Sequence, residues 1–235
     1  ETAPATEAAA PAETEAAGEE TEAKEAAADT GDKELITVGY AQVGAESDWR
    51  TANTESFKST FTEENGYKLI FDDAQQKQEN QIKAIRSFIQ QDVDYIVVAP
   101  VVETGWETVL EEAKEAGIPV ILSDRMMQVS DDSLFEAWVG GNFVKEGETC
   151  GNWLADYLEA QGRGDEEINI VTIQGTIGAS AQVGRTEGFA NVLAEHSNWK
   201  MLDMQTGEFT QAKGQEVMES FLKSYDDIDV VICEN

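Results

Sequence analysis

The chain has 235 residues, of which 47 are acidic and 16 basic, and its formal net charge is −31. A surface this acidic argues against nucleic acid or an anionic membrane surface as a partner. The length allows one large domain or two small ones, and no segment approaches the roughly 18 consecutive apolar residues that span a bilayer.

The first 33 residues differ from the rest, because they contain only Ala, Glu, Thr, Pro, Gly, Asp and Lys. Ten acids and two lysines give them a charge of −8, which leaves −23 for residues 34–235. Without aromatic or large aliphatic side chains, such a segment cannot bury enough surface to offset the entropy lost on ordering. We therefore expect residues 1–33 to form a disordered acidic tether.

From residue 34 onward, short apolar runs typical of buried strands alternate with amphipathic segments typical of helices. Asp48 is a candidate N-cap for the first helix. The expected strands lie at 35–40, 67–71, 94–99 and 119–123, and the helices between them at 49–64, 76–91 and 106–116. This alternation predicts a parallel sheet with helices on both faces.

The alternation pauses at residues 126–141, where Asp131-Asp132-Ser133 indicates a turn. A short strand is expected at 134–139 within this region. The alternation then resumes with helices at 143–160, 179–196 and 211–225, and with strands at 168–173, 200–205 and 229–233. We therefore expect two doubly wound α/β lobes joined by a hinge, the first at 34–138 and the second at 139–235. Because the chain stops directly after a strand, the pattern also predicts that a C-terminal part is missing.

Catalytic and metal-binding patterns are weak. Cys150 and Cys233 fit two small buried thiols better than a disulfide, although a disulfide stays possible. His196 is the only histidine, and no spacing suggests a metal site. The turn at 175–178 lacks the third glycine and the Lys-Ser/Thr pair of phosphate-binding loops. Ser180 lies outside any nucleophile elbow. We therefore expect a protein without catalytic residues, cofactor or metal.

The strand at 119–123 ends abruptly in Ser123-Asp124-Arg125. In doubly wound sheets, ligands lie outside the carboxyl ends of the strands, so Asp124 and Arg125 are candidates to face a ligand. An adjacent acid and base suit a ligand with several hydroxyl groups. The competing interpretation is a strand end closed by a solvated ion pair.

A set of short motifs runs through the chain: GYAQVGAESDWR at 39–50, DAQQKQENQ at 73–81, APVV at 99–102, SDR at 123–125, QGT at 174–176 and GEFT at 207–210. Together they resemble the ribose-binding-like, type I periplasmic binding proteins of ABC sugar importers. The likeness covers about residues 35–235, and it is strongest to galactofuranose-binding members.

The resemblance implies two lobes that close on a hinge over one monosaccharide, either galactofuranose or a related hexose or pentose. It also implies a set of ligand-binding residues: Trp49, Arg50, Asp124, Arg125, Asn142, Arg185, Phe209 and Asn235. The family often has Asp-Asn where this chain has Gly141-Asn142, so one Asp contact is lost. Aromatic rings can cover the apolar faces of a sugar, while Asp, Asn and Arg side chains bind its hydroxyl groups.

Each aromatic or basic candidate also has a structural interpretation. Trp49 would be a core residue at the first turn of its helix, Phe209 a packing residue at a helix start, and Arg185 a surface cation. The remaining tryptophans are expected in the core or at interfaces: Trp106, Trp138, Trp153 and Trp199.

The resemblance implies a non-enzymatic, extracytoplasmic protein, either a cell-surface lipoprotein or periplasmic, that delivers its sugar to ABC permease subunits. The tether would link the binding module to a lipid anchor upstream of residue 1, and a signal peptide would precede that anchor. No nucleic acid partner is expected. A sugar-sensing module for a signalling partner is the alternative. The effector domain of a transcription regulator is a weaker one, because an acidic segment occupies the place of its basic DNA-binding part.

Overall fold

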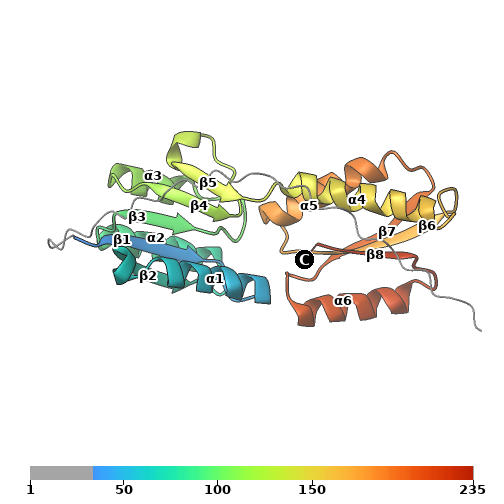
Figure 1. The fold of residues 1–235 in the computed structure, drawn as a ribbon, viewed down its shortest axis with the longest axis horizontal. Coiled ribbons are helices and arrows are strands. Elements are labelled where there is room, and N and C mark those ends of the chain that lie inside the picture. The colour runs from blue at the N-terminus through green and yellow to red at the C-terminus, as the bar shows by residue number, and fades with distance from the viewer. Residues whose placement is uncertain (1–33, 235) are drawn as a thin grey trace, which may run out of the picture. The chain divides into compact units, whose positions relative to one another are not determined.

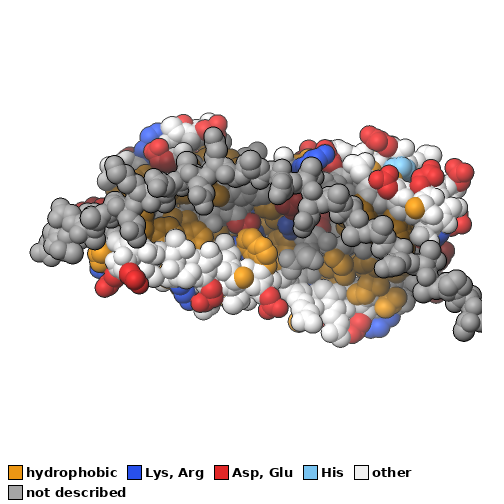
Figure 2. All heavy atoms as spheres, in the orientation of Figure 1, with side chains coloured by type: hydrophobic (Ala, Val, Ile, Leu, Met, Phe, Trp, Pro, Cys, Tyr) orange, Lys and Arg blue, Asp and Glu red, His pale blue; other side chains and the backbone are white. Residues whose placement is uncertain are grey.

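The computed structural model describes residues 34–234. The expected tether at 1–33 and the predicted ligand residue Asn235 lie outside the described residues. The described part forms two parallel sheets flanked by helices (Figure 1). Acidic side chains are scattered over the face shown in Figure 2, in keeping with the net charge. No helix of residues 34–234 has the length and apolar character needed to cross a membrane.

The first sheet has the order β2-β1-β3-β4-β5, and all neighbouring strands are parallel. Its strands are β1 (Ile36–Gln42), β2 (Tyr67–Asp73), β3 (Tyr95–Val98), β4 (Val120–Asp124) and β5 (Ala137–Gly140). They alternate with α1 (Asp48–Thr60), α2 (Gln78–Gln90) and α3 (Glu107–Glu115), and with the short 3-10 helices η1 (Glu63–Asn65) and η2 (Asp132–Leu134). The predicted α/β alternation is therefore confirmed in this half of the chain.

The second sheet has the order β7-β6-β8 and is also parallel throughout. Its strands are β6 (Ile168–Gln174), β7 (Trp199–Thr206) and β8 (Val230–Cys233), and its helices are α4 (Phe143–Ala160), α5 (Ser180–Leu193) and α6 (Gln211–Ser224). In Figure 1, α4 and α5 lie on one side of this sheet and α6 on the other. The predicted fold class, parallel α/β, is confirmed here as well.

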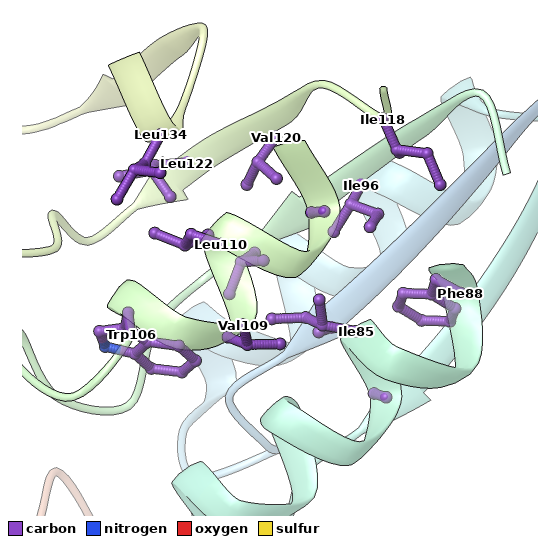
Figure 3. Close-up of a cluster of buried hydrophobic side chains, with 14 of the residues drawn as sticks. Ile85, Phe88, Ile96, Trp106, Val109, Leu110, Ile118, Val120, Leu122 and Leu134 are labelled. Carbon is purple, nitrogen blue, oxygen red and sulfur yellow. The ribbon is translucent and has the colours of Figure 1, made fainter. Parts of the chain in front are cut away.

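The two faces of the first sheet bury separate apolar clusters, as the strand period of two requires. Ile96 and Val98 pack toward α2 and α3, whereas Val97 between them packs on the α1 side. Figure 3 shows Ile85 and Phe88 of α2 in the first of these clusters, together with Trp106, Val109, Leu110 and strand residues. These buried layers fix the positions of the carboxyl ends of the strands. Two of the predicted ligand residues, Asp124 and Arg125, lie at such an end.

Several local expectations need correction. Ser47, not Asp48, is the N-cap of α1, because its side chain accepts the hydrogen bond from Arg50 N and Asp48 is already helical. The expected lobe boundary between residues 138 and 139 falls inside β5, a strand of the first sheet. Cys150 and Cys233 are free, as expected, but both are exposed rather than buried. Cys150 lies on α4 and Cys233 on the edge strand β8, and both line the cavity described below.

The four remaining tryptophans, expected in the core or at interfaces, divide between the core and the surface. Trp106 and Trp199 are buried in the core, with exposed fractions of 0% and 7%. Trp138 on β5 and Trp153 on α4 are 38% and 63% exposed and take no part in the buried apolar clusters of the described residues.

Candidate binding site

A cavity of about 560 Å³ collects residues from both halves of the described chain, a volume within the usual range for small-molecule sites. Six of the eight predicted ligand residues line it: Trp49, Arg50, Asp124, Arg125, Arg185 and Phe209. The other lining residues are Glu46, Ser47, Gly141, Phe143, Glu146, Gly147, Cys150, Ala181, Phe189, Ile232, Cys233 and Glu234.

Arg50 is fixed by two carboxylates at the start of α1. Its Nε donates to Glu46 Oε1 at 3.0 Å, and its Nη2 donates to Asp124 Oδ2 at 2.7 Å. Only 2% of its side chain is exposed. Burial disfavours the charge, but the Asp124 and Glu46 carboxylates outweigh this effect and raise the pKa of Arg50 above its ordinary value. Arg50 is therefore a charged hydrogen-bond donor whose orientation is fixed by two carboxylates.

Asp124 occupies an unusual backbone conformation, with φ 63° in the left-handed region. Arg125 N donates to Ser123 O at 2.7 Å, so Asp124 stands at the centre of a three-residue γ-turn. A non-glycine residue in this region costs about 1–3 kcal/mol. The turn ends β4 abruptly and directs the Asp124 carboxylate to Arg50.

Arg125 is almost completely buried, with 3% of the residue exposed. Its Nη2 lies 3.5 Å from Glu46 Oε1, and its Nη1 donates to Val101 O at 3.3 Å. Burial, with the neighbouring Arg50 charge, lowers the pKa of Arg125 to about 10. The guanidinium of Arg125 therefore stays charged near neutral pH. Its contacts to carboxylate and carbonyl oxygens are longer than the contacts of Arg50 to Glu46 and Asp124.

Two buried polar atoms in the cavity lining have no hydrogen-bond partner among residues 34–234: Glu46 Oε2 and Arg125 Nε. One is an acceptor and the other a donor. Buried polar atoms of native proteins almost always have partners, so these two atoms of the cavity wall are available to a ligand group or to water. A carboxylate oxygen, Asp124 Oδ2, lies 3.9 Å from Arg125 Nε. A hydroxyl group, which both donates and accepts, suits both atoms.

Two aromatic rings contribute apolar surface to the cavity. Trp49 is 56% exposed, and the Arg50 guanidinium carbon lies 4.9 Å from its ring centroid. Phe209 is buried, and Arg125 lies over its ring at 4.9 Å. Gly175 makes room for Phe209, because a Cβ at that position would lie 1.9 Å from the ring carbon Cζ. The exposed position of Trp49 favours the binding interpretation over the core one.

Arg185 on α5 lines the cavity from the second sheet. Its Nε donates to Glu146 Oε2 on α4 at 2.8 Å, its Nη1 donates to the Glu234 carbonyl oxygen, and it lies over the Phe143 ring. Gly147 lets the two helices approach this closely, because a Cβ there would lie 2.3 Å from the Arg185 carbonyl oxygen. Arg185 is therefore held in place rather than being a free surface cation.

Glu234 closes the carboxyl end of β8. Its carboxylate accepts hydrogen bonds from Gly175 N at 2.9 Å and from Thr186 Oγ1. Burial raises the pKa of Glu234, although these two hydrogen bonds and Arg185 oppose the rise. The side chain thereby ties three segments of the second sheet together beside the cavity.

The structure gives Asn142 a local role that the sequence did not suggest. Its side chain caps α4 by accepting a hydrogen bond from Lys145 N at 3.0 Å, and it is not among the residues lining this cavity. Two hydrogen bonds from backbone amides also join the two halves of the chain: Met126 N donates to the Ser180 side chain at Oγ (2.9 Å), and Glu103 N donates to Gly178 O (2.8 Å).

Several lining residues with polar or aromatic contacts were not predicted, among them Glu46, Phe143, Glu146 and Glu234. Glu46 follows a glycine-containing loop and precedes Trp49-Arg50, which was the only sequence signal for it. Within residues 34–234, no group of three or more His, Cys, Asp and Glu side chains is arranged to hold a metal ion.

Residues 38–235 match the family model described as a periplasmic binding protein domain. The galactofuranose-binding protein YtfQ of Escherichia coli is 50% identical over 189 residues, which is 80% of this chain and 58% of that protein. The chain therefore spans less than two thirds of the length of this relative.

Two solved structures show the same fold with bound sugars. A Mycobacterium smegmatis protein in complex with β-D-fucofuranose is 50% identical, with a TM-score of 0.80, and the match covers 85% of this chain and 64% of that one. The binding protein of the Shewanella arabinose ABC transporter, bound to α- and β-L-arabinofuranose, is 53% identical. Its TM-score is 0.75, and the match covers 81% of this chain and 61% of that one.

Proposed function

The chain belongs to the periplasmic binding protein domain family, and from this premise we propose that it is the sugar-binding component of an ABC importer. The observation that carries the proposal is the unsatisfied pair in the cavity wall, Glu46 Oε2 and Arg125 Nε. Glu46 Oε2 needs a donor and Arg125 Nε an acceptor, and sugar hydroxyl groups can supply both. The aromatic rings of Trp49 and Phe209 lie in the same lining and suit the apolar faces of a sugar.

The charges of the cavity support a neutral ligand. Its lining contains three arginines, and each of them pairs with a carboxylate of the same lining: Arg50 with Glu46 and Asp124, Arg125 with Glu46, and Arg185 with Glu146. Because no arginine is left to balance an anionic ligand, a phosphorylated or acidic sugar would enter at an electrostatic cost. A neutral monosaccharide would only replace water at hydroxyl-binding atoms.

The ring form in the proposal is a furanose. The names of three similar proteins mention galactofuranose, fucofuranose and arabinofuranose. In this chain, Arg50, Asp124, Arg125 and Arg185 would bind the hydroxyl groups, and Trp49 and Phe209 would cover the ring. Asn142 and Asn235 stay predictions from the resemblance.

The proposal includes a location and a partner. Two lobes would close over the sugar, and the chain would cross between them just after β5 (Ala137–Gly140). The protein would act outside the cytoplasm and present its closed form to permease subunits. Residues 1–33 would serve as a tether to a lipid anchor.

A calorimetric panel of monosaccharides, including galactose, arabinose and fucose, tests the proposal. The bound ring form can be identified by NMR with a ¹³C-labelled sugar. Trp49→Ala should abolish most of the binding, and Trp153→Ala is the matched control. Both tryptophans are more than half exposed, but Trp153 does not line this cavity. Absence of binding to every monosaccharide, or equal effects of the two variants, would contradict the proposal.

A further inference from the structure

The strained γ-turn at the end of β4 requires contacts that stabilise its backbone conformation. Asp124 has φ 63°, and the turn is closed by the hydrogen bond from Arg125 N to Ser123 O at 2.7 Å. We propose that Trp138 is a positioning residue for the sugar site, because its indole holds the Asp124 peptide in this conformation. The inference rests on the proposed sugar-binding function, for which Asp124 is a ligand residue.

The contact is a single hydrogen bond from a neighbouring strand. Trp138 Nε1 donates to Asp124 O at 3.2 Å, and Trp138 does not itself line the cavity. Its ring is 38% exposed and belongs to none of the buried apolar clusters of residues 34–234. Core packing therefore does not explain a large aromatic residue at this position, whereas its indole N–H has a defined partner.

Gly140 makes this contact possible. Trp138 and Gly140 lie two residues apart on β5, so their side-chain positions share one face of the strand. A Cβ at Gly140 would lie 2.1 Å from Asp124 O and 2.4 Å from Trp138 Nε1. The missing side chain therefore leaves the space in which the indole nitrogen reaches the carbonyl oxygen. Any other residue would force the strand, the indole or the turn to move.

The contact fixes where the Asp124 carboxylate points. With its carbonyl oxygen held by Trp138 and the following amide held by Ser123, the Asp124 side chain reaches Arg50 Nη2 at 2.7 Å. Without the indole, the peptide would be free to leave the left-handed region, which is unfavourable for aspartate. Both the carboxylate and the start of the Arg125 side chain would then shift.

Two variants disturb the contact from opposite sides. Trp138→Phe keeps an aromatic ring but removes the donor, and Gly140→Ala fills the space for the indole. Each should lower the affinity for the best sugar of the panel about fivefold to tenfold, as the loss of one neutral hydrogen bond typically does. The double variant should be clearly less than additive, because both changes break the same contact. Trp153→Phe is the control for loss of an exposed indole and should leave the affinity unchanged.

A sugar-independent measurement separates this inference from the proposed function. Hydrogen exchange of the Arg125 amide, which closes the turn, should become at least about fivefold faster in Trp138→Phe. The Leu110 amide, which donates to Trp106 O at the start of α3, should keep its rate. If the protein binds no sugar, the proposed function fails, and exchange at Arg125 alone decides the positioning role. Unchanged exchange at Arg125, or faster exchange with unchanged affinity, would overturn the inference.

Discussion

Glu46→Gln is the sharpest single test of the cavity. Glu46 is almost completely buried, with 2% of its side chain exposed, and its two oxygens have different surroundings. Oε1 contacts Arg50 Nε at 3.0 Å and Arg125 Nη2 at 3.5 Å. Oε2 has no hydrogen-bond partner among residues 34–234. The substitution keeps the shape of the side chain while it removes the charge and one acceptor.

The size of the effect follows from this geometry. The amide oxygen of a glutamine can keep both contacts to Arg50 and Arg125, but the amide nitrogen in place of Oε2 donates and cannot accept. A sugar hydroxyl group would therefore lose a charge-assisted hydrogen bond worth about 1.5–3 kcal/mol. At about 1.4 kcal/mol per factor of ten, the affinity should fall about tenfold to 150-fold.

Isothermal titration with the best monosaccharide measures this change, and a thermal melt without sugar measures the stability of the same variant. Glu55→Gln on α1 is the matched control, because its side chain is 68% exposed and pairs only loosely with Lys58 at 3.7 Å. It should leave both affinity and melting temperature unchanged. If Glu46→Gln binds sugar within about twofold of the parent, a range too small for a lost hydrogen bond, Oε2 does not accept from the ligand.

Three further predictions concern pH, the tether and metals. Because burial raises the pKa of Glu234, its protonated form is favoured in the folded state; that stabilisation is present at low pH and is lost as pH rises through the raised pKa. Relative to the parent, Glu234→Gln should therefore gain melting temperature as the pH rises above the ordinary carboxyl pKa of about 4.3, as measured by scanning calorimetry. A constant difference would contradict the role of burial. Removal of residues 1–33 should leave sugar affinity unchanged in titration, since the cavity is lined by residues between Glu46 and Glu234; a tenfold change would show that the tether contacts the site. A chelator should not alter the affinity, because residues 34–234 hold no cluster suited to a metal ion, and chelator-sensitive binding would refute a metal-free site.

The elements were predictable because their signals are local. The apolar period of α4 and the residue before it placed this helix at 143–160, the bounds that the structure has. The N-cap of α1 was misplaced by one residue, because Ser47 and Asp48 are both good caps and only the backbone conformation distinguishes them. Strand β5 begins three residues later than expected, since its side chains are exposed and carry no alternation.

The candidate site was only partly predictable. Asp124 and Arg125 stand at the end of an apolar strand, which is a local signal. The burial of Glu46, in contrast, arises from its contact with Arg125, which is far away in the sequence, and no local pattern reveals such a pair. The same holds for Trp138, whose indole partner lies on the neighbouring strand.

The close fit between Gly175 and Phe209 has a consequence for how this cavity changes during evolution. The ring rests where a Cβ of residue 175 would be, at 1.9 Å from its nearest carbon. An alanine at this position would displace the Phe209 ring, and with it the surface over which the Arg125 guanidinium lies at 4.9 Å. Replacement of a single hydrogen atom by a methyl group would thus change the apolar wall and the packing of Arg125 together. Selection on this one glycine would therefore act on the shape of the cavity and on the position of a buried charged residue at the same time.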